Sequence, residues 1–152
     1  TPLENLGYGN LVDQLYKKVA RVNVVNPIFL TEHPISLSPL ARANDDNPEI
    51  TDRFQLIING AEIINAYSEL VDPQEQERRL EEQAALKADG DEEAMPMDHE
   101  YISAMEVGMP PISGWGMGID RVVQLLTNAD NIKDVVMFPL MRPLNNEVKD
   151  SE

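Results

Sequence analysis

The chain of 152 residues contains no cysteine. A disulfide framework, a thiolate metal site and a cysteine nucleophile are therefore excluded within it. It also lacks an apolar run long enough to cross a bilayer, and it does not start with a basic stretch followed by an apolar one. We therefore expect no membrane association and no secretion signal, which fits a cytoplasmic protein.

Basic residues are scarce as well, because 12 Lys and Arg stand against 27 Asp and Glu, for a formal net charge of −15. Surfaces that bind nucleic acid are normally basic, since Lys and Arg contact the phosphates. We therefore expect these residues alone to bind nucleic acid poorly. The chain starts with Thr inside a polar turn, so we also expect it to be a piece of a longer protein.

The hydrophobic fraction of 42% is enough for a core, and the length suits one domain. We expect that domain over residues 1–144, followed by a polar tail at 145–152. An Asn-Gly pair at 59–60 predicts a hairpin, so the order of elements is not the alternating pattern of a parallel sheet. The sequence therefore predicts an α+β fold, an antiparallel sheet flanked by helices.

Turn formers, caps and periodicity predict the individual elements. Ten acidic residues between 75 and 100 are expected to form a solvated face. The expected elements are a helix capped by Asn10 with Leu11, Leu15, Val19 and Val22 on one face, a short strand within 24–34, a long loop over 35–51, paired strands at 54–58 and 61–70, a helix from Asp72 to about Ala88, a helix from Asp98 closed by Gly108, a buried helix at 119–129 and a strand at 135–138.

The return strand of the hairpin reads EIINAYSEL and is unusually polar. Strict alternation puts Asn65, Tyr67 and Glu69 on one side and Glu62 on the other. Carboxylates, an amide and a ring could line a pocket, where the carboxylates would need cations such as a metal ion and a substrate ammonium. An edge strand with its polar side in water is the competing interpretation.

The stretch GWGMGIDR at 114–121 is the second candidate site. Glycines at alternate positions of a strand leave one face without side chains, so a ligand can lie on the backbone. The following helix offers its first amides and Arg121 to an anion such as a phosphate. Close packing is the competing explanation of the glycines. His33 and His99 are expected to be ordinary surface or capping histidines.

Both candidate sites occur in an order that resembles the class II lysyl-tRNA synthetases. The resemblance covers about residues 7–143, the C-terminal part of that family's catalytic domain with its motif 3. It implies ATP-dependent formation of lysyl-adenylate and transfer of lysine to tRNA. The stretches that carry it are FLTEHPISLSPLAR, NPEITDRF, EIINAYSELVDPQEQ, GMPPISGWGMGIDR and FPLMRP.

The resemblance also implies a role for each matching residue. Asn65 would contact the lysine, Tyr67 would flank its side chain, and Glu69 would pair with its ammonium. Glu62 would bind Mg²⁺ and the ATP phosphates, and Arg121 would bind the γ-phosphate as the catalytic cation. Gly114 and Gly116 would form the floor of the lysine pocket.

One position departs from the family's pattern. The family usually has Glu, a magnesium ligand, where this chain has Gln55. Gln55, at this ATP-binding position, can still offer an oxygen to Mg²⁺ but brings no charge, so weaker metal binding is expected.

No match to the family's anticodon-binding domain, motif 1 or motif 2 occurs in these residues. We therefore expect the isolated chain to be inactive, the tRNA to be bound by other parts of the protein, and the full-length protein to be a homodimer. Two alternatives stay open. One is a paralogue that passes lysine to a protein, and the other is a non-catalytic amino-acid-binding module.

Overall fold

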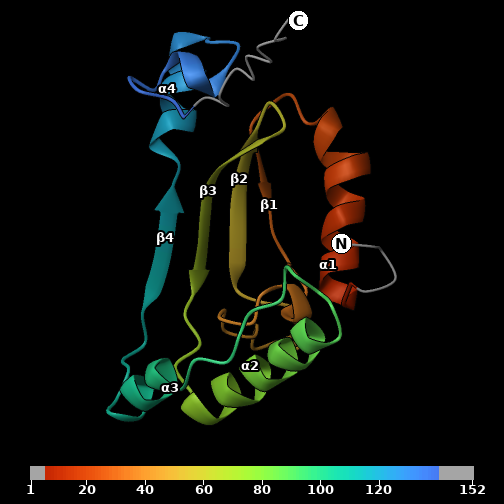
Figure 1. The fold of residues 1–152 in the computed structure, drawn as a ribbon, viewed down its shortest axis with the longest axis vertical. Helices are drawn as coiled ribbons and strands as arrows, with labels where there is room; N and C mark the ends of the chain where they lie inside the picture. Colours follow the sequence, from red (N-terminus) through yellow and green to blue (C-terminus); the bar gives the residue numbers. More distant parts are fainter. Residues whose placement is uncertain (1–5, 141–152) are drawn as a thin grey trace, which may run out of the picture. The chain divides into compact units, whose positions relative to one another are not determined.

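The computed structural model describes residues 6–140, which fall into two compact units divided between Gly118 and Ile119. The first unit holds a four-stranded antiparallel sheet in the order β1 (Ile28–Leu30), β2 (Arg53–Ile58), β3 (Ala61–Ser68) and β4 (Ser113–Met117) (Figure 1). With its helices it confirms the predicted α+β fold. The expected domain boundary at 144 and the polar tail at 145–152 lie outside the described residues.

The predicted hairpin forms between β2 and β3. Asn59 and Gly60 have φ angles of 49° and 70°, the left-handed values that a tight turn between twisted strands requires. Because β3 pairs with β2 on one side and with β4 on the other, it is an interior strand. The interpretation of the polar strand as an edge strand is therefore wrong.

The first helix begins differently from the prediction. α1 spans Tyr8–Leu15 with Gly7 at its N-cap, and it continues into a π-helical turn at Tyr16–Ala20 and a 3₁₀ turn at Arg21–Asn23. Asn10 is not the cap, because its side chain donates instead to the carboxylate of Asp91, at 2.9 Å. The apolar residues of this face are exposed, namely Leu11, Leu15, Val19 and Val22.

Asp91 is also the exception to the expected solvated acidic segment. Its side chain is fully buried and accepts hydrogen bonds from the backbone N–H groups of Gly7 and Glu93 as well as from Asn10. Burial raises the pKa of Asp91, but these hydrogen bonds outweigh it and leave the pKa below its ordinary value. The buried carboxylate therefore fastens the start of α1 to the segment after α2.

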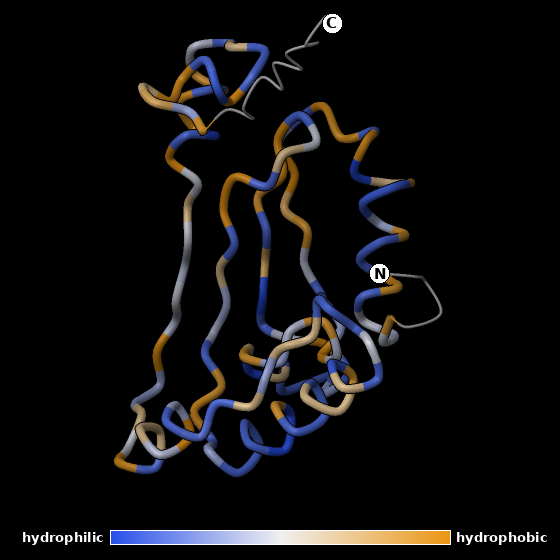
Figure 2. The backbone as a smooth tube through the Cα atoms, in the orientation of Figure 1, coloured by the Kyte–Doolittle hydropathy of each residue, from blue (hydrophilic) through white to orange (hydrophobic). Residues whose placement is uncertain are grey.

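Two predicted helices lie between β3 and β4 in the chain. α2 spans Pro73–Ala88, and α3 spans His99–Glu106, where the Asp98 side chain caps the first turn. Leu80 of α2 packs with Ile102 and Met105 of α3 in a small core. The other residues of α2 before Ala84 are hydrophilic, as the colouring in Figure 2 shows. None of the helices between residues 6 and 140 has the length and hydropathy needed to span a bilayer.

We predict that the cap of α2 contributes measurably to stability. The Asp72 side chain accepts hydrogen bonds from the N–H groups of Gln74 and Glu75, at 2.9 and 3.3 Å. Asp72→Ala should lower the free energy of unfolding by about 1 kcal/mol, measured in urea. Glu77→Ala, on an exposed part of the same helix, is the control and should change it far less. Equal losses in the two variants would contradict the capping role.

The second unit contains α4 at Ile119–Thr127 and a 3₁₀ turn at Ile132–Asp134. The helix was predicted, but its expected burial is wrong, because Ile119 and Leu126 are 60% and 79% exposed. The expected strand at 135–138 is also wrong. A strand needs a partner for its backbone N–H and C=O groups, and no other described segment pairs with these residues.

Candidate functional site

One face of the sheet collects the predicted site residues of the first unit. Residues directly opposite each other in an antiparallel pair share a face. Arg53 pairs with Tyr67, and Gln55 pairs with Asn65. On the other side of β3, Gly114 pairs with Tyr67 and Gly116 with Asn65. The amide, the ring and both glycines therefore lie on a single surface formed by three neighbouring strands.

A β-bulge adds Glu62 to this surface. Leu56 pairs with Ile64, but the next residue, Ile57, pairs with Glu62, so β3 carries one extra residue at this point. The bulge reverses the alternation and turns Glu62 to the same face as Gln55 and Asn65. Strict alternation had placed Glu62 on the opposite face, and that part of the prediction is wrong.

Glu69 lies at the end of the same face, directly after β3. Its backbone N–H donates to the carbonyl of Ile112, at 2.9 Å, but its half-buried carboxylate has no hydrogen-bond or ion-pair partner among the described residues. Burial raises the pKa of Glu69 above its ordinary value. The charge of Glu69 also adds to burial in raising the pKa of Tyr67 and of Tyr101 on α3. The carboxylate is thus placed to gain from a cationic ligand.

The two glycines of β4 differ in what lies above them. A methyl group at Gly114 would collide with the carboxylate oxygen Oε1 of Glu69, whereas a methyl group at Gly116 would meet no atom within 4 Å. Gly114 therefore gives Glu69 room to reach over the strand. Gly116 leaves open space beside Asn65. The pale colour of much of β4 in Figure 2 reflects the intermediate hydropathy of its Ser, Gly and Trp residues.

Arg53 holds the amide of Asn65 in one orientation. Its Nε–H donates to Asn65 Oδ1 at 3.0 Å, and its Nη1 donates to the Ser38 hydroxyl at 2.8 Å and to the Leu37 carbonyl at 3.3 Å. Because the guanidinium takes the amide oxygen, Asn65 offers its Nδ2–H donors to a ligand. No other described residue accepts from Nδ2. Sequence reasoning missed this role, which only the side-chain geometry shows.

Gln55 connects Glu62 to His33. Its amide nitrogen donates to Glu62 Oε2 at 2.6 Å, and its amide oxygen lies 3.3 Å from His33 Nε2. His33 is only 4% exposed, so the expectation of a surface histidine is wrong, whereas His99 is exposed as expected. Burial and, next, the charge of Arg53 lower the pKa of His33. Nothing in the neighbouring sequence indicates this burial, which arises because the loop after β1 folds over β2.

The predicted metal position does not fit a cation as arranged here. The described residues contain no group of three or more His, Asp or Glu side chains that could hold a metal ion. Gln55 directs a nitrogen, not an oxygen, toward Glu62, and its oxygen faces His33. Mg²⁺ prefers several oxygen ligands at short distance. Glu62 and Gln55 therefore do not form a magnesium site by themselves.

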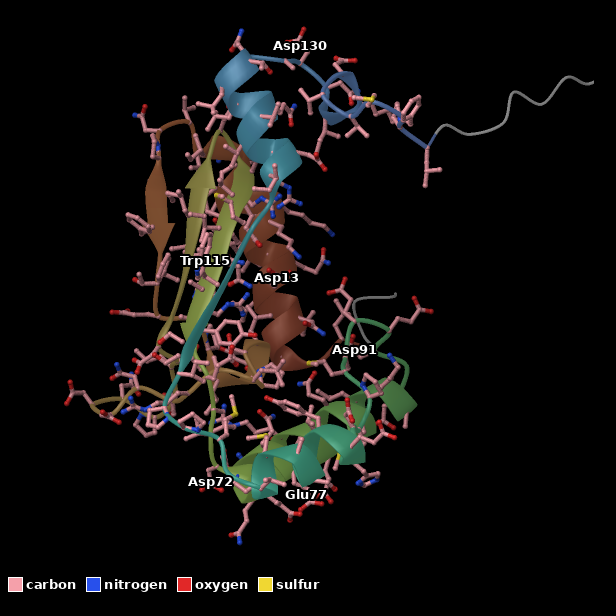
Figure 3. The ribbon with its side chains drawn as sticks, turned by 90° about the vertical axis from the view of Figure 1, so that its left-hand side faces the viewer. Asp13, Asp72, Glu77, Asp91, Trp115 and Asp130 are labelled. Carbon is pink, nitrogen blue, oxygen red and sulfur yellow. The ribbon has the colours of Figure 1, made fainter. Side chains whose placement is uncertain are left out.

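Cavities follow the same face. The larger of two cavities beside it, of about 510 Å³, lies between the α1 segment and the sheet and is lined by Tyr16, His33, Arg53, Gln55 and Glu62, among others. In the side view of Figure 3, α1 is marked by Asp13 and β4 by Trp115. A smaller cavity of about 160 Å³ borders Arg53, Asn65 and Tyr67. These two cavities therefore adjoin four of the predicted site residues, Gln55, Glu62, Asn65 and Tyr67.

Arg121 belongs to the second unit. It lies in the first turn of α4 and is exposed, and its predicted contact with a phosphate stays a prediction.

Comparison with known proteins agrees with this fold. Residues 8–142 match the family described as tRNA synthetases class II (D, K and N), so the chain belongs to that family. A lysine–tRNA ligase of Enterobacter sp. (strain 638) is 51% identical over 138 residues, which are 91% of this chain and 27% of the relative. One of Helicobacter pylori (strain G27) is 52% identical over 143 residues, 94% of this chain and 28% of the relative.

A third relative is the heat-inducible lysine–tRNA ligase of Escherichia coli (strain K12). It is 50% identical over 137 residues, which are 90% of this chain and 27% of the relative. The chain thus spans about a quarter of the length of the curated relatives it matches. The family resemblance drawn from the motifs is confirmed.

Proposed function

We propose that this chain is the lysine-binding part of the catalytic domain of a lysine–tRNA ligase. In the longer protein, the carboxylate of lysine attacks the α-phosphate of ATP and releases pyrophosphate, and the lysyl group of the adenylate then passes to tRNA with release of AMP. The proposal includes a cytoplasmic location and a homodimeric state for the longer protein. The observation that carries it is the carboxylate of Glu69, which has no partner among residues 6–140 and lies above the glycine-containing strand β4.

The arrangement suits an amino acid with a cationic side chain. Glu69 lies four positions after Asn65, a distance of roughly 13 Å along extended backbone. The amide N–H of Asn65 would donate to the carboxyl oxygens of lysine at one end, and Glu69 would accept from its ammonium at the other. Between them, Tyr67 can flank the aliphatic chain and add cation–π attraction to the ammonium.

Selectivity follows from the same geometry. A substrate without an ammonium at the right reach would bury the Glu69 carboxylate without a partner, and such burial costs several kcal/mol. A substrate with a second carboxylate, such as aspartate, would add repulsion. The assignment of lysine therefore rests on charge complementarity as well as on the names of the relatives.

The remaining site residues face the nucleotide in this proposal. Glu62 would lie near the ATP phosphates, and Arg121 would bind the γ-phosphate. Mg²⁺, where it is bound with ATP, would neutralise phosphate charge. The chain's own residues orient lysine and form hydrogen bonds to it. Gly116 has no side chain, so it leaves the floor open for the adenylate.

The longer protein that contains this chain tests the proposal directly. It should exchange labelled pyrophosphate into ATP only when lysine is present, and it should charge tRNA with lysine. Exchange with lysine but transfer only to a protein would support the paralogue alternative. Binding of lysine with no exchange would support the non-catalytic module.

We predict that Arg53 acts on lysine through Asn65. Arg53→Met removes the donor that holds Oδ1, so the affinity for lysine should fall about tenfold, as is typical when a charged hydrogen bond is lost. Cadaverine has both amino groups but no carboxylate, so its binding to the chain should change little. Chemical-shift titrations measure both affinities. A parallel loss for both ligands would mean that Arg53 only supports the fold.

A further inference from the structure

Three side chains from separate parts of the first unit form a hydrogen-bonded chain. His33 comes from the loop after β1, Gln55 from β2 and Glu62 from β3. The contacts are Gln55 Nε2 to Glu62 Oε2 at 2.6 Å and His33 Nε2 to Gln55 Oε1 at 3.3 Å. The three residues also line the larger cavity. The bulge in β3 is what brings Glu62 within reach of Gln55.

The chemistry of the groups fixes the direction of each hydrogen bond. A carboxylate oxygen at 2.6 Å needs a donor, so the nitrogen of the Gln55 amide must face Glu62. The oxygen of the amide then faces His33, and His33 Nε2 must carry a proton. His33 Nδ1 is buried and has no hydrogen-bond partner in the part of the chain that the structure describes, so a proton there would be unsatisfied. The arrangement therefore favours the neutral Nε2–H tautomer of His33.

We infer that His33 and Gln55 are positioning residues for the Glu62 carboxylate. Gln55 holds this carboxylate by a hydrogen bond, whereas a carboxylate at position 55 would share a metal ion with it. His33 in turn orients the Gln55 amide. The inference rests on the proposed function only for the role of Glu62 toward the nucleotide. The Gln55 amide supplies an N–H on the side of Glu62 that a shared cation would approach. A cation at that place must displace this hydrogen bond, and it gains no second negative charge in return.

Metal binding by the full 152-residue chain tests whether Gln55 holds Glu62 in place of a shared metal ion. Mn²⁺ is the probe, because its electron paramagnetic resonance signal separates free from bound ion. Without nucleotide, the wild-type chain should show no saturable Mn²⁺ site that depends on Glu62. Gln55→Glu should raise the affinity for Mn²⁺ about tenfold or more, since affinity rises with the number of ligand charges. Adding Glu62→Gln to that variant should abolish the gain.

A saturable Mn²⁺ site in the wild-type chain that is lost in Glu62→Gln would overturn the inference. So would a Gln55→Glu variant that is folded by circular dichroism and binds Mn²⁺ no better than wild type. Glu49→Gln, a change on an exposed loop, is the matched control for the loss of one carboxylate.

The tautomer of His33 tests whether His33 orients the Gln55 amide, and it can be measured first in the wild-type chain. Long-range ¹H–¹⁵N correlation spectra of the wild-type chain should show the proton on Nε2 and a bare Nδ1. Gln55→Met, which keeps the length of the side chain without an acceptor, should reduce that preference. A proton on Nδ1 in the wild-type chain would overturn the proposed hydrogen bond from His33 to Gln55. Neither readout uses lysine, ATP or tRNA, so both are independent of whether the proposed ligase activity is found.

Discussion

Replacing Glu69 by Gln should abolish lysine binding without weakening the fold. The carboxylate has no partner among the described residues, so a ligand ammonium is the cation it lacks. Loss of one member of a buried ion pair costs about 3–5 kcal/mol. The affinity for lysine should therefore fall by at least about a hundredfold. Calorimetric titration of the chain measures it, with Glu77→Gln at an exposed position of α2 as the control.

The stability of Glu69→Gln distinguishes a binding role from a structural one. Burial raises the pKa of Glu69 in the folded chain above the ordinary value of 4.5 that the unfolded chain should have. The folded state therefore binds the proton more tightly. The free energy of unfolding falls as the pH rises from the pKa of Glu69 in the unfolded chain through its higher pKa in the folded chain. At pH 7 the neutral Gln avoids this cost, so the melting temperature should stay equal or rise. A lower melting temperature would contradict the account.

The pH dependence of binding follows from the same shift. Only the ionised carboxylate attracts an ammonium, so lysine binding by the wild-type chain should be lost as the pH falls through the raised pKa of Glu69. The midpoint of that loss should lie above the pKa of an ordinary glutamate. Binding that persists unchanged down to pH 4 would show that another group holds the ammonium.

Adding one methyl group at each glycine of β4 should separate the two parts of the lysine floor. Gly116→Ala places a methyl group in open space, so the chain should fold with unchanged stability. If a ligand lies on the floor, the same methyl group blocks it, and affinity for a lysyl-adenylate mimic should fall strongly. A methyl group adds only about 1–3 kcal/mol of discrimination in a forgiving pocket, so about tenfold is the smallest loss expected.

Gly114→Ala should behave differently, because the new methyl group collides with Glu69. The carboxylate must move, so lysine selectivity should fall together with affinity, and overpacking should lower the stability by about 1 kcal/mol or more. Urea unfolding and titration with the lysyl and aspartyl mimics measure both effects. Identical behaviour of the two alanine variants would mean that the floor has no preferred ligand position.

Local signals in the sequence were sufficient for the centre of the sheet. Asn59-Gly60 adopts the left-handed angles that a two-residue hairpin turn demands, so β2 and β3 could be paired in advance. The caps at Asp72 and Asp98 could also be predicted, because an Asp just before a helix commonly accepts hydrogen bonds from the free N–H groups of its first turn. These features depend only on neighbours in the chain.

Features that depend on distant partners could not be predicted. The bulge that turns Glu62 inward is invisible in a pattern of alternating residues. Asn10 looked like a cap, but the distant Asp91 takes its side chain. Val135 to Phe138 have the composition of a strand, yet no other described segment pairs with them. The roles of Arg53 and His33 likewise arise from contacts across the sheet.

Titration of the folded chain with a non-hydrolysable lysyl-adenylate mimic, beside its aspartyl counterpart, tests the central claim most directly. The claim is that Asn65, Glu69 and the floor at Gly114 and Gly116 form a preformed lysine pocket within these residues. The account predicts saturable binding of the lysyl mimic, its loss in Glu69→Gln, and no binding of the aspartyl mimic. Equal binding of both mimics, or no binding by a chain shown to be folded, would contradict it.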